Sequence, residues 1–192
     1  MIHLGWRDLA KLLAAFALWS GIGLYAFPGY AQLVTPATSE VLQALRPHGL
    51  DLSLANEYPY VRWGYEEQEQ GKQGGRVSFT LLVYNTVLYL SLVSAWAGLS
   101  RWARLLFAVS AAPVIFVFHV VDLGLTVESR VLSILQAQHY DFLHHFGLWF
   151  SLVKYYNFLS ITGLKQVIFL LLFLVQWKYL DRPRYSRLAG VR

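Results

Sequence analysis

The chain has 192 residues, of which 56% are hydrophobic and 14% are charged, and its formal net charge is +5. Soluble domains of this length carry about a quarter charged residues, so this composition excludes an ordinary soluble globular protein. The chain contains no cysteine, which excludes disulfides, thiolate metal sites and a cysteine nucleophile.

Four apolar stretches predict transmembrane helices, because about 17 to 25 apolar residues match the hydrocarbon thickness of a bilayer. The few charges within them lie mostly near their ends. We therefore expect an integral membrane protein, mainly α-helical, with about four transmembrane helices and a small extracytoplasmic β-hairpin or meander between the first two. The predicted spans are residues 9–28, 77–99, 105–125 and 162–180.

The first span has two interpretations. Its basic start, apolar core and small residues near Ala31 also describe a cleaved signal peptide. The apolar stretch is long for such a peptide, and Trp19, Tyr25 and Phe27 are typical of a helix that stays in the membrane. These features favour an uncleaved anchor.

Residues 29–76 form the longest polar segment and are expected outside the cytoplasm. A short helix is predicted from Ser39 to Pro47. Beyond it, apolar and polar residues alternate on both sides of "ANEYP", which predicts strands that pair with one another. "EEQEQGKQGG" has the composition of a solvated turn, and "RVSFTLLVY" is expected to form a third strand leading into the second span.

The third span contains "FVFHVVDLG", which places His119 and Asp122 one helical turn apart. Ionisable groups within membrane helices seldom face lipid and often mark functional sites. One interpretation is a structural pair near the outer interface, in which Asp122 bonds His119. The other is an intramembrane polar site with Asn85 of the second span as its third member.

Residues 126–161 are rich in aromatic residues and predict an extracytoplasmic interfacial or re-entrant segment. The segment also holds His139, His144 and His145. Adjacent histidines point to different sides of a helix, and the spacings of known zinc sites are missing, so we expect no metal site. No cofactor is expected either, although His119 with one of these three histidines remains an alternative haem or pigment site.

The distribution of basic residues predicts the orientation. Segments on the side of the N-terminus hold nine lysines and arginines against Asp8 and Asp181, whereas those on the other side hold seven against eight acids. Basic residues near span ends stay in the cytoplasm, so both termini are expected there. The basic tail after Tyr179 favours contact with anionic lipid over nucleic-acid binding.

Motifs of the common catalytic classes are missing: the sequence has no Gly-x-Ser-x-Gly, no phosphate-binding loop and no His-Glu-x-x-His. Serines in the spans, such as Ser91 and Ser110, are typical of helix packing. The sequence therefore favours a protein that is not an enzyme.

In overall plan the chain resembles the accessory membrane proteins that accompany exosortases in Gram-negative bacteria, of the exosortase H-associated type. The resemblance rests on "RVSFTLLVYNTVLYLSLVSAWAG", on the basic turn "LSRWARLL" and on the final "GLKQVIFLLLFLVQW". Exosortases use a membrane cysteine, which this chain lacks. The resemblance thus implies a non-catalytic subunit of the bacterial inner membrane, whose partner is another membrane protein or an exported protein substrate.

Overall fold

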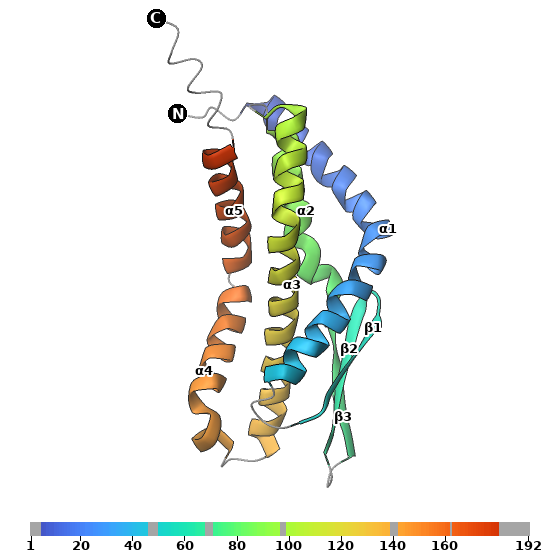
Figure 1. Cartoon of the computed structure of the whole chain (residues 1–192), viewed down its shortest axis with the longest axis vertical. Coiled ribbons are helices and arrows are strands. Elements are labelled where there is room, and N and C mark those ends of the chain that lie inside the picture. Colours follow the sequence, from blue (N-terminus) through green and yellow to red (C-terminus); the bar gives the residue numbers. More distant parts are fainter. Residues whose placement is uncertain are drawn as a thin grey trace, which may run out of the picture. The chain divides into compact units, whose positions relative to one another are not determined.

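The computed structural model describes residues 5–45, 50–67, 71–96, 99–138, 142–161 and 163–180 (Figure 1). Its elements follow the order α1 (Trp6–Leu45), β1 (Leu52–Glu57), β2 (Tyr60–Glu67), β3 (Gly71–Ser78), α2 (Phe79–Ala95), α3 (Arg101–Gln138), α4 (Phe142–Ile161) and α5 (Leu164–Leu180). The chain divides into two compact units. Unit 1 comprises Met1–Tyr25, Tyr84–Ile115 and Lys165–Arg192, and unit 2 comprises Ala26–Val83 and Phe116–Leu164.

Within the described ranges, α1 and α3 are long and apolar enough to cross a membrane, and α4 with α5 adds a third such helix if the bent pair is one span. The shorter helix α2 has 17 residues and is also apolar. The mainly helical character with membrane-length helices is thus confirmed. The number of spans stays a prediction.

Helix α1 extends well past the predicted end of the first span. It has 40 residues and continues through Pro28 and Pro36, so the prediction of a separate short helix at Ser39 is wrong. Each proline removes one backbone hydrogen bond. The helix continues because Ala31, Val34 and Leu42 lie along one face at helical spacing and are buried in the core of unit 2.

Helix α3 continues in the same way beyond the predicted end of the third span. Val127, Val131 and Leu135 extend the buried stripe begun by Leu123, at spacings of three or four residues. At 1.5 Å per residue, helices of 40 and 38 residues measure about 60 and 57 Å, roughly twice the hydrocarbon thickness. Each is therefore long enough to cross a bilayer and project from it.

The expected β-segment is confirmed as a three-stranded antiparallel meander in the order β1-β2-β3 (Figure 1). Its third strand differs from the prediction. β3 starts at Gly71, within the run taken as a solvated turn, and ends at Ser78, so that Phe79 already belongs to α2. The polar residues of this run form a strand because β2 supplies a full antiparallel ladder, from Tyr60↔Ser78 to Glu67↔Gly71.

One face of the sheet is fixed to helices of unit 2. The alternating residues Leu52, Val61, Trp63, Tyr65 and Val77 are buried in one cluster with side chains of α1 and α3. Burying an aliphatic side chain of this kind stabilises a fold by about 1.5 to 3 kcal/mol. A three-stranded sheet of this size has too small a core to be stable alone, so the helices hold it in place.

Unit 1 consists of helical segments joined by aromatic packing and uncharged hydrogen bonds. Trp96 and Phe107 each contact the ring of Phe173 edge-on, with centroids 5.2 and 6.0 Å apart. The indole of Trp19 donates to Ser94 Oγ at 2.8 Å, and the hydroxyl of Tyr89 donates to Gln176. These bonds satisfy polar atoms that would otherwise lie unpaired among apolar side chains.

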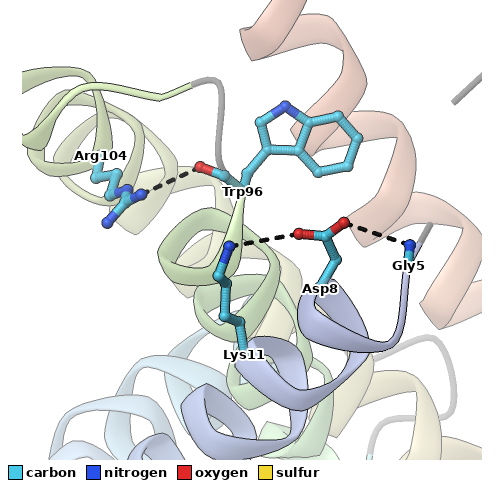
Figure 2. A network of polar contacts seen from close by, with 5 residues as sticks. All are labelled: Gly5, Asp8, Lys11, Trp96 and Arg104. Carbon is cyan, nitrogen blue, oxygen red and sulfur yellow. Dashed lines mark hydrogen bonds and ion pairs between the residues drawn. The ribbon is translucent and has the colours of Figure 1, made fainter. Parts of the chain in front are cut away.

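The charged residues drawn in Figure 2 lie at helix ends of unit 1. Asp8 accepts from the amide of Gly5 and forms an ion pair with Lys11, both at 3.4 Å, and so caps the start of α1 (Figure 2). Arg104 donates to the carbonyl of Trp96 at 3.1 Å, just after the end of α2. A cation there satisfies a terminal carbonyl and interacts favourably with the helix dipole.

Candidate functional site

A groove of about 930 Å³ runs along the sheet of unit 2. Residues of all three strands and of the last part of α1 line it, among them Ser39, Gln43, Ser53, Arg62, Trp63, Gly74 and Arg76. We call it the sheet groove. Its volume falls in the range of ligand pockets, about 300 to 1,000 Å³.

The middle of the groove is lined by residues with small side chains or none. Ser53, Gly64 and Gly74 are neighbours across the three strands, so the sheet carries almost no side chains along this row. A Cβ on Gly74 would lie 2.5 Å from the carbonyl oxygen of Trp63, and one on Gly64 would lie 3.2 Å from that of Gln73. Both positions therefore favour glycine, because the two strands approach too closely for a side chain.

Two arginines stand on the next row of the same face. Arg62 and Arg76 are paired across β2 and β3, and Glu57 bridges them with N···O distances of 3.0 and 3.4 Å. Both arginine side chains are more than 60% exposed. Because exposed ion pairs contribute only about 0 to 1 kcal/mol, these guanidinium groups can exchange Glu57 for an incoming carboxylate or carbonyl at little cost.

Trp63 of β2 carries a buried polar atom without a partner. The indole nitrogen of Trp63 is buried and has no hydrogen-bond acceptor among the residues that the structure describes. Leaving such a donor unpaired costs about 1 to 3 kcal/mol. Because side chains alternate along β2, this indole belongs to the face that is buried against the helices, whereas Arg62 and Arg76 lie on the outward face. The guanidinium groups of the two arginines are therefore the donors that the groove offers to the carbonyl oxygens of an extended chain.

Strands β1 and β3 are the edges of the sheet, since each pairs only with β2 in the described part of the chain. An edge strand presents backbone N–H and C=O groups on which another chain can add a strand. The sheet groove and these edges together make the candidate site an interaction surface.

Three buried ionisable groups lie on the part of α3 that belongs to unit 2. His119, Asp122 and Glu128 are each at most 1% exposed. His119 Nδ1 bonds the hydroxyl of Tyr30 on α1 at 2.9 Å. On α4, Tyr156 donates to Asp122 at 2.8 Å and Trp149 donates to Glu128 at 2.9 Å. The prediction that His119 and Asp122 face other helices is confirmed.

These contacts join α3 to its neighbours through aromatic side chains. A neutral hydroxyl or indole donor satisfies a carboxylate oxygen with a short, charge-assisted bond and adds apolar contact area. Lys154 of α4 also donates to Ser133 of α3. We call these bonds between α3 and α4 the α3–α4 brace.

Asn85, the third member of the predicted polar site, belongs to unit 1, whereas His119 and Asp122 belong to unit 2. It is 3% exposed, and it lines a mostly apolar pocket of about 440 Å³ within unit 1. The alternative ligand His139 lies outside the described residues, as do the side chains of His144 and His145. Among the described side chains, no group of three or more His, Cys, Asp or Glu could hold a metal ion.

Sequence reasoning missed Glu128 and the aromatic partners Tyr30, Trp149 and Tyr156. It ended the third span at residue 125, before Glu128, although Val127 and Val131 continue the helical spacing of the apolar residues. That spacing was the available signal for a longer helix. Nothing local in the sequence links an aromatic residue of α4 to a carboxylate of α3.

Helix α4 carries an exposed apolar stripe opposite the residues that contact α3. Leu148, Leu152, Tyr155 and Phe158 recur at spacings of three or four and are 55 to 78% exposed. Such a face is typical of a helix at a membrane interface. The expectation of an interfacial segment here stays a prediction.

No protein-family model matches this chain, and no curated protein or solved structure is similar enough to it to count as a match.

Proposed function

We propose that this chain is a non-enzymatic, multi-pass accessory protein of the bacterial inner membrane that presents its β-meander to a partner outside the cytoplasm. The observation that carries the proposal is the sheet itself. One face is anchored to helices of unit 2, while the edges and the groove with Arg62 and Arg76 stay accessible. A sheet presented in this way suits strand addition by an extended segment of a membrane protein or an exported protein.

The charge of the two units supports the orientation. Unit 1 contains ten lysines and arginines, whereas unit 2 contains six. The positive-inside rule assigns the ends of the unit 1 helices to the cytoplasm and the sheet to the outside. In this proposal α1, α2, α3 and α5 are the four membrane helices.

The resemblance to exosortase-associated proteins supplies the partner class. It implies a protein-sorting or cell-envelope assembly system, in which this chain binds either the exosortase or its exported substrate. The sheet groove is open enough for an extended peptide, and its arginines favour a segment with carboxylates or exposed carbonyls.

A haem- or pigment-binding subunit is the second candidate. His119 is completely buried and its Nδ1 already bonds Tyr30, so an iron reaches its ring only if neighbouring side chains move. An absorption spectrum of the purified protein decides this alternative, since a Soret band would establish it.

The main experiment places a photo-crosslinking amino acid at Ser53 on β1 and at Gln73 on β3, with Leu18 on α1 as a control at an exposed apolar position. A reporter inserted at Gly71, and another fused after Arg192, establish the topology in the same strain. We expect crosslinks to one polytopic enzyme or exported protein from both sheet positions and none to it from Leu18.

Two results would contradict the proposal. Reporter activity outside the cytoplasm at Arg192 would refute the four-span topology. Sheet positions that crosslink only lipid, or the same proteins as Leu18, would refute the docking function.

A further inference from the structure

A second site lies in unit 1, away from the sheet groove. Its pocket of about 440 Å³ is lined by twelve residues of α1, α2 and α5, most of them aliphatic or aromatic, including Leu13, Phe16, Tyr84, Leu88, Phe169 and Leu170. We call it the Asn85 pocket. The volume fits a small molecule or part of a lipid and is too small for a helix of about 10 Å diameter to fill along its length.

Asn85 gives this pocket its one unsatisfied acceptor. Its side chain is 3% exposed, and Oδ1 has no hydrogen-bond donor among the described residues. Two other polar side chains of the wall differ in this respect: Tyr89 donates to Gln176 and to the carbonyl of Phe107, and Ser91 donates to the carbonyl of Val87. An amide oxygen buried among apolar side chains retains the cost of its lost hydrogen bond until a donor reaches it.

Water is a poor source of that donor at this position. A buried water needs two to four polar partners, and most of this wall is hydrocarbon. If α2 spans the bilayer, the molecules that reach the pocket are membrane lipids or other apolar solutes. Among these, only one that carries a hydroxyl or N–H group satisfies Asn85 while its chain fills the apolar wall.

We propose that the Asn85 pocket binds a membrane-dissolved molecule with an apolar chain and a hydroxyl group that donates to Asn85 Oδ1. A straight-chain lipid alcohol and a branched prenyl alcohol share this chemistry. The inference rests on the membrane placement proposed above, but it does not depend on what the sheet binds.

The test uses the full-length protein in lipid nanodiscs and a hexadecanol that carries a photoreactive diazirine, compared with its methyl ether. The two probes have the same chain and differ in the hydroxyl donor. We expect the alcohol to label the peptides around Tyr84 and Phe169 about tenfold more than the ether does, as the loss of one hydrogen bond to a buried acceptor predicts. Unlabelled straight-chain and prenyl alcohols, used as competitors, then show which chain the pocket prefers.

Two variants make the result specific. Asn85→Leu keeps a similar volume and removes the acceptor, so labelling by the alcohol should fall to the level of the ether. Leu13→Trp leaves Asn85 intact but adds bulk to the wall, and should reduce labelling by both probes. The matched control is Leu24→Trp, at an exposed α1 position outside the pocket wall, which should leave labelling unchanged.

Equal labelling of the wild-type protein by alcohol and ether would overturn the inference, as would an alcohol preference that survives Asn85→Leu. Failure of both alcohols to compete would do the same. Crosslinking from Ser53 and Gln73 is measured on the same Asn85→Leu protein. Unchanged crosslinks with lost alcohol preference would show that the pocket and the docking surface function separately. A wild-type protein that prefers the alcohol but gives no crosslinks from Ser53 and Gln73 would refute the docking function alone.

Discussion

The two units bury polar groups of different kinds. Among the described residues of unit 1, the buried polar side chains are Asn85, Ser91 and Gln176, none of which ionises. Unit 2 buries His119, Asp122 and Glu128 together with neutral residues. An ion in hydrocarbon costs far more free energy than an amide does, so this difference supports the membrane placement proposed above for the helices of unit 1.

The exposed surface of unit 1 is rich in apolar side chains. Large aliphatic side chains on α1, α3 and α5 remain more than half exposed, including Leu13, Leu18, Leu24, Leu105, Val109 and Leu171. Exposed aliphatic side chains of this kind are compatible with helices that are apolar enough to cross a membrane, as α1 and α3 are. In unit 2 the sheet contributes its apolar side chains to an internal core, and its outward face carries Arg62, Arg76 and small residues.

We expect the largest loss of stability when a charged side chain replaces a buried uncharged one in unit 1. Gln176 donates to the carbonyl of Phe107 at 3.2 Å and to Ser110 Oγ at 2.9 Å, so in Gln176→Glu a carboxylate would face the carbonyl oxygen. We expect a loss of about 2.5 to 3.5 kcal/mol in stability, as for an acidic residue in the centre of a membrane helix. Yield of inserted protein and thermal unfolding in detergent measure it.

The matched change in unit 2 is Asp122→Asn, which removes a charge and keeps an acceptor for Tyr156. It should change stability by less than about 1 kcal/mol. If Gln176→Glu is tolerated as well as Asp122→Asn, the proposed difference between the two units is wrong.

A smaller effect is expected when a bond of the α3–α4 brace is removed. Asp122→Leu leaves the hydroxyl of Tyr156 without this acceptor and should destabilise the protein by about 1 to 3 kcal/mol. Tyr156→Phe removes only the donor, so it should cost less. Chemical or thermal unfolding of both single variants and the double variant gives the coupling energy between the two side chains.

Coupling near zero would show that the two groups act independently, which contradicts the brace. Complementation of a deletion strain separates structure from function. Loss of activity in well-folded Asp122→Asn would indicate a functional proton or cofactor site in place of a structural bond.

The last prediction compares the same substitution at two glycines, one in each unit. Gly74→Ala forces a Cβ to within 2.5 Å of the Trp63 carbonyl oxygen and should destabilise the sheet by about 1 to 3 kcal/mol, because one strand backbone must move. The same change at Gly21 of α1 meets no atom within 4 Å and should stabilise the helix by about 0.5 to 1 kcal/mol.

Limited proteolysis of the β2–β3 hairpin measures the first effect, and thermal unfolding measures the second. Equal stability of the two variants would contradict the close approach of β2 and β3 described here.

The sequence by itself determined the features that depend on local pattern. The apolar stretches predicted membrane-length helices, and the alternation around "ANEYP" predicted a small antiparallel meander with Leu52, Val61 and Trp63 on one face. It also singled out His119 and Asp122, because ionisable groups in an apolar run are expected to be buried and bonded. Side-chain periodicity and the free-energy cost of exposing polar groups to hydrocarbon depend on each residue and its near neighbours in the sequence. They can therefore be evaluated without knowing the fold.

Only the tertiary structure decided where the helices ended and what each buried group bonded. Packing in the core of unit 2 carries α1 past Pro28 and α3 past Leu125, against the local signals for a stop. The partners Tyr30 and Tyr156 lie 89 and 34 residues away from the groups that they bond. Pairing with β2 likewise turns the polar run at Gly71 into a strand. These outcomes depend on contacts between segments distant in the chain, which no local pattern specifies.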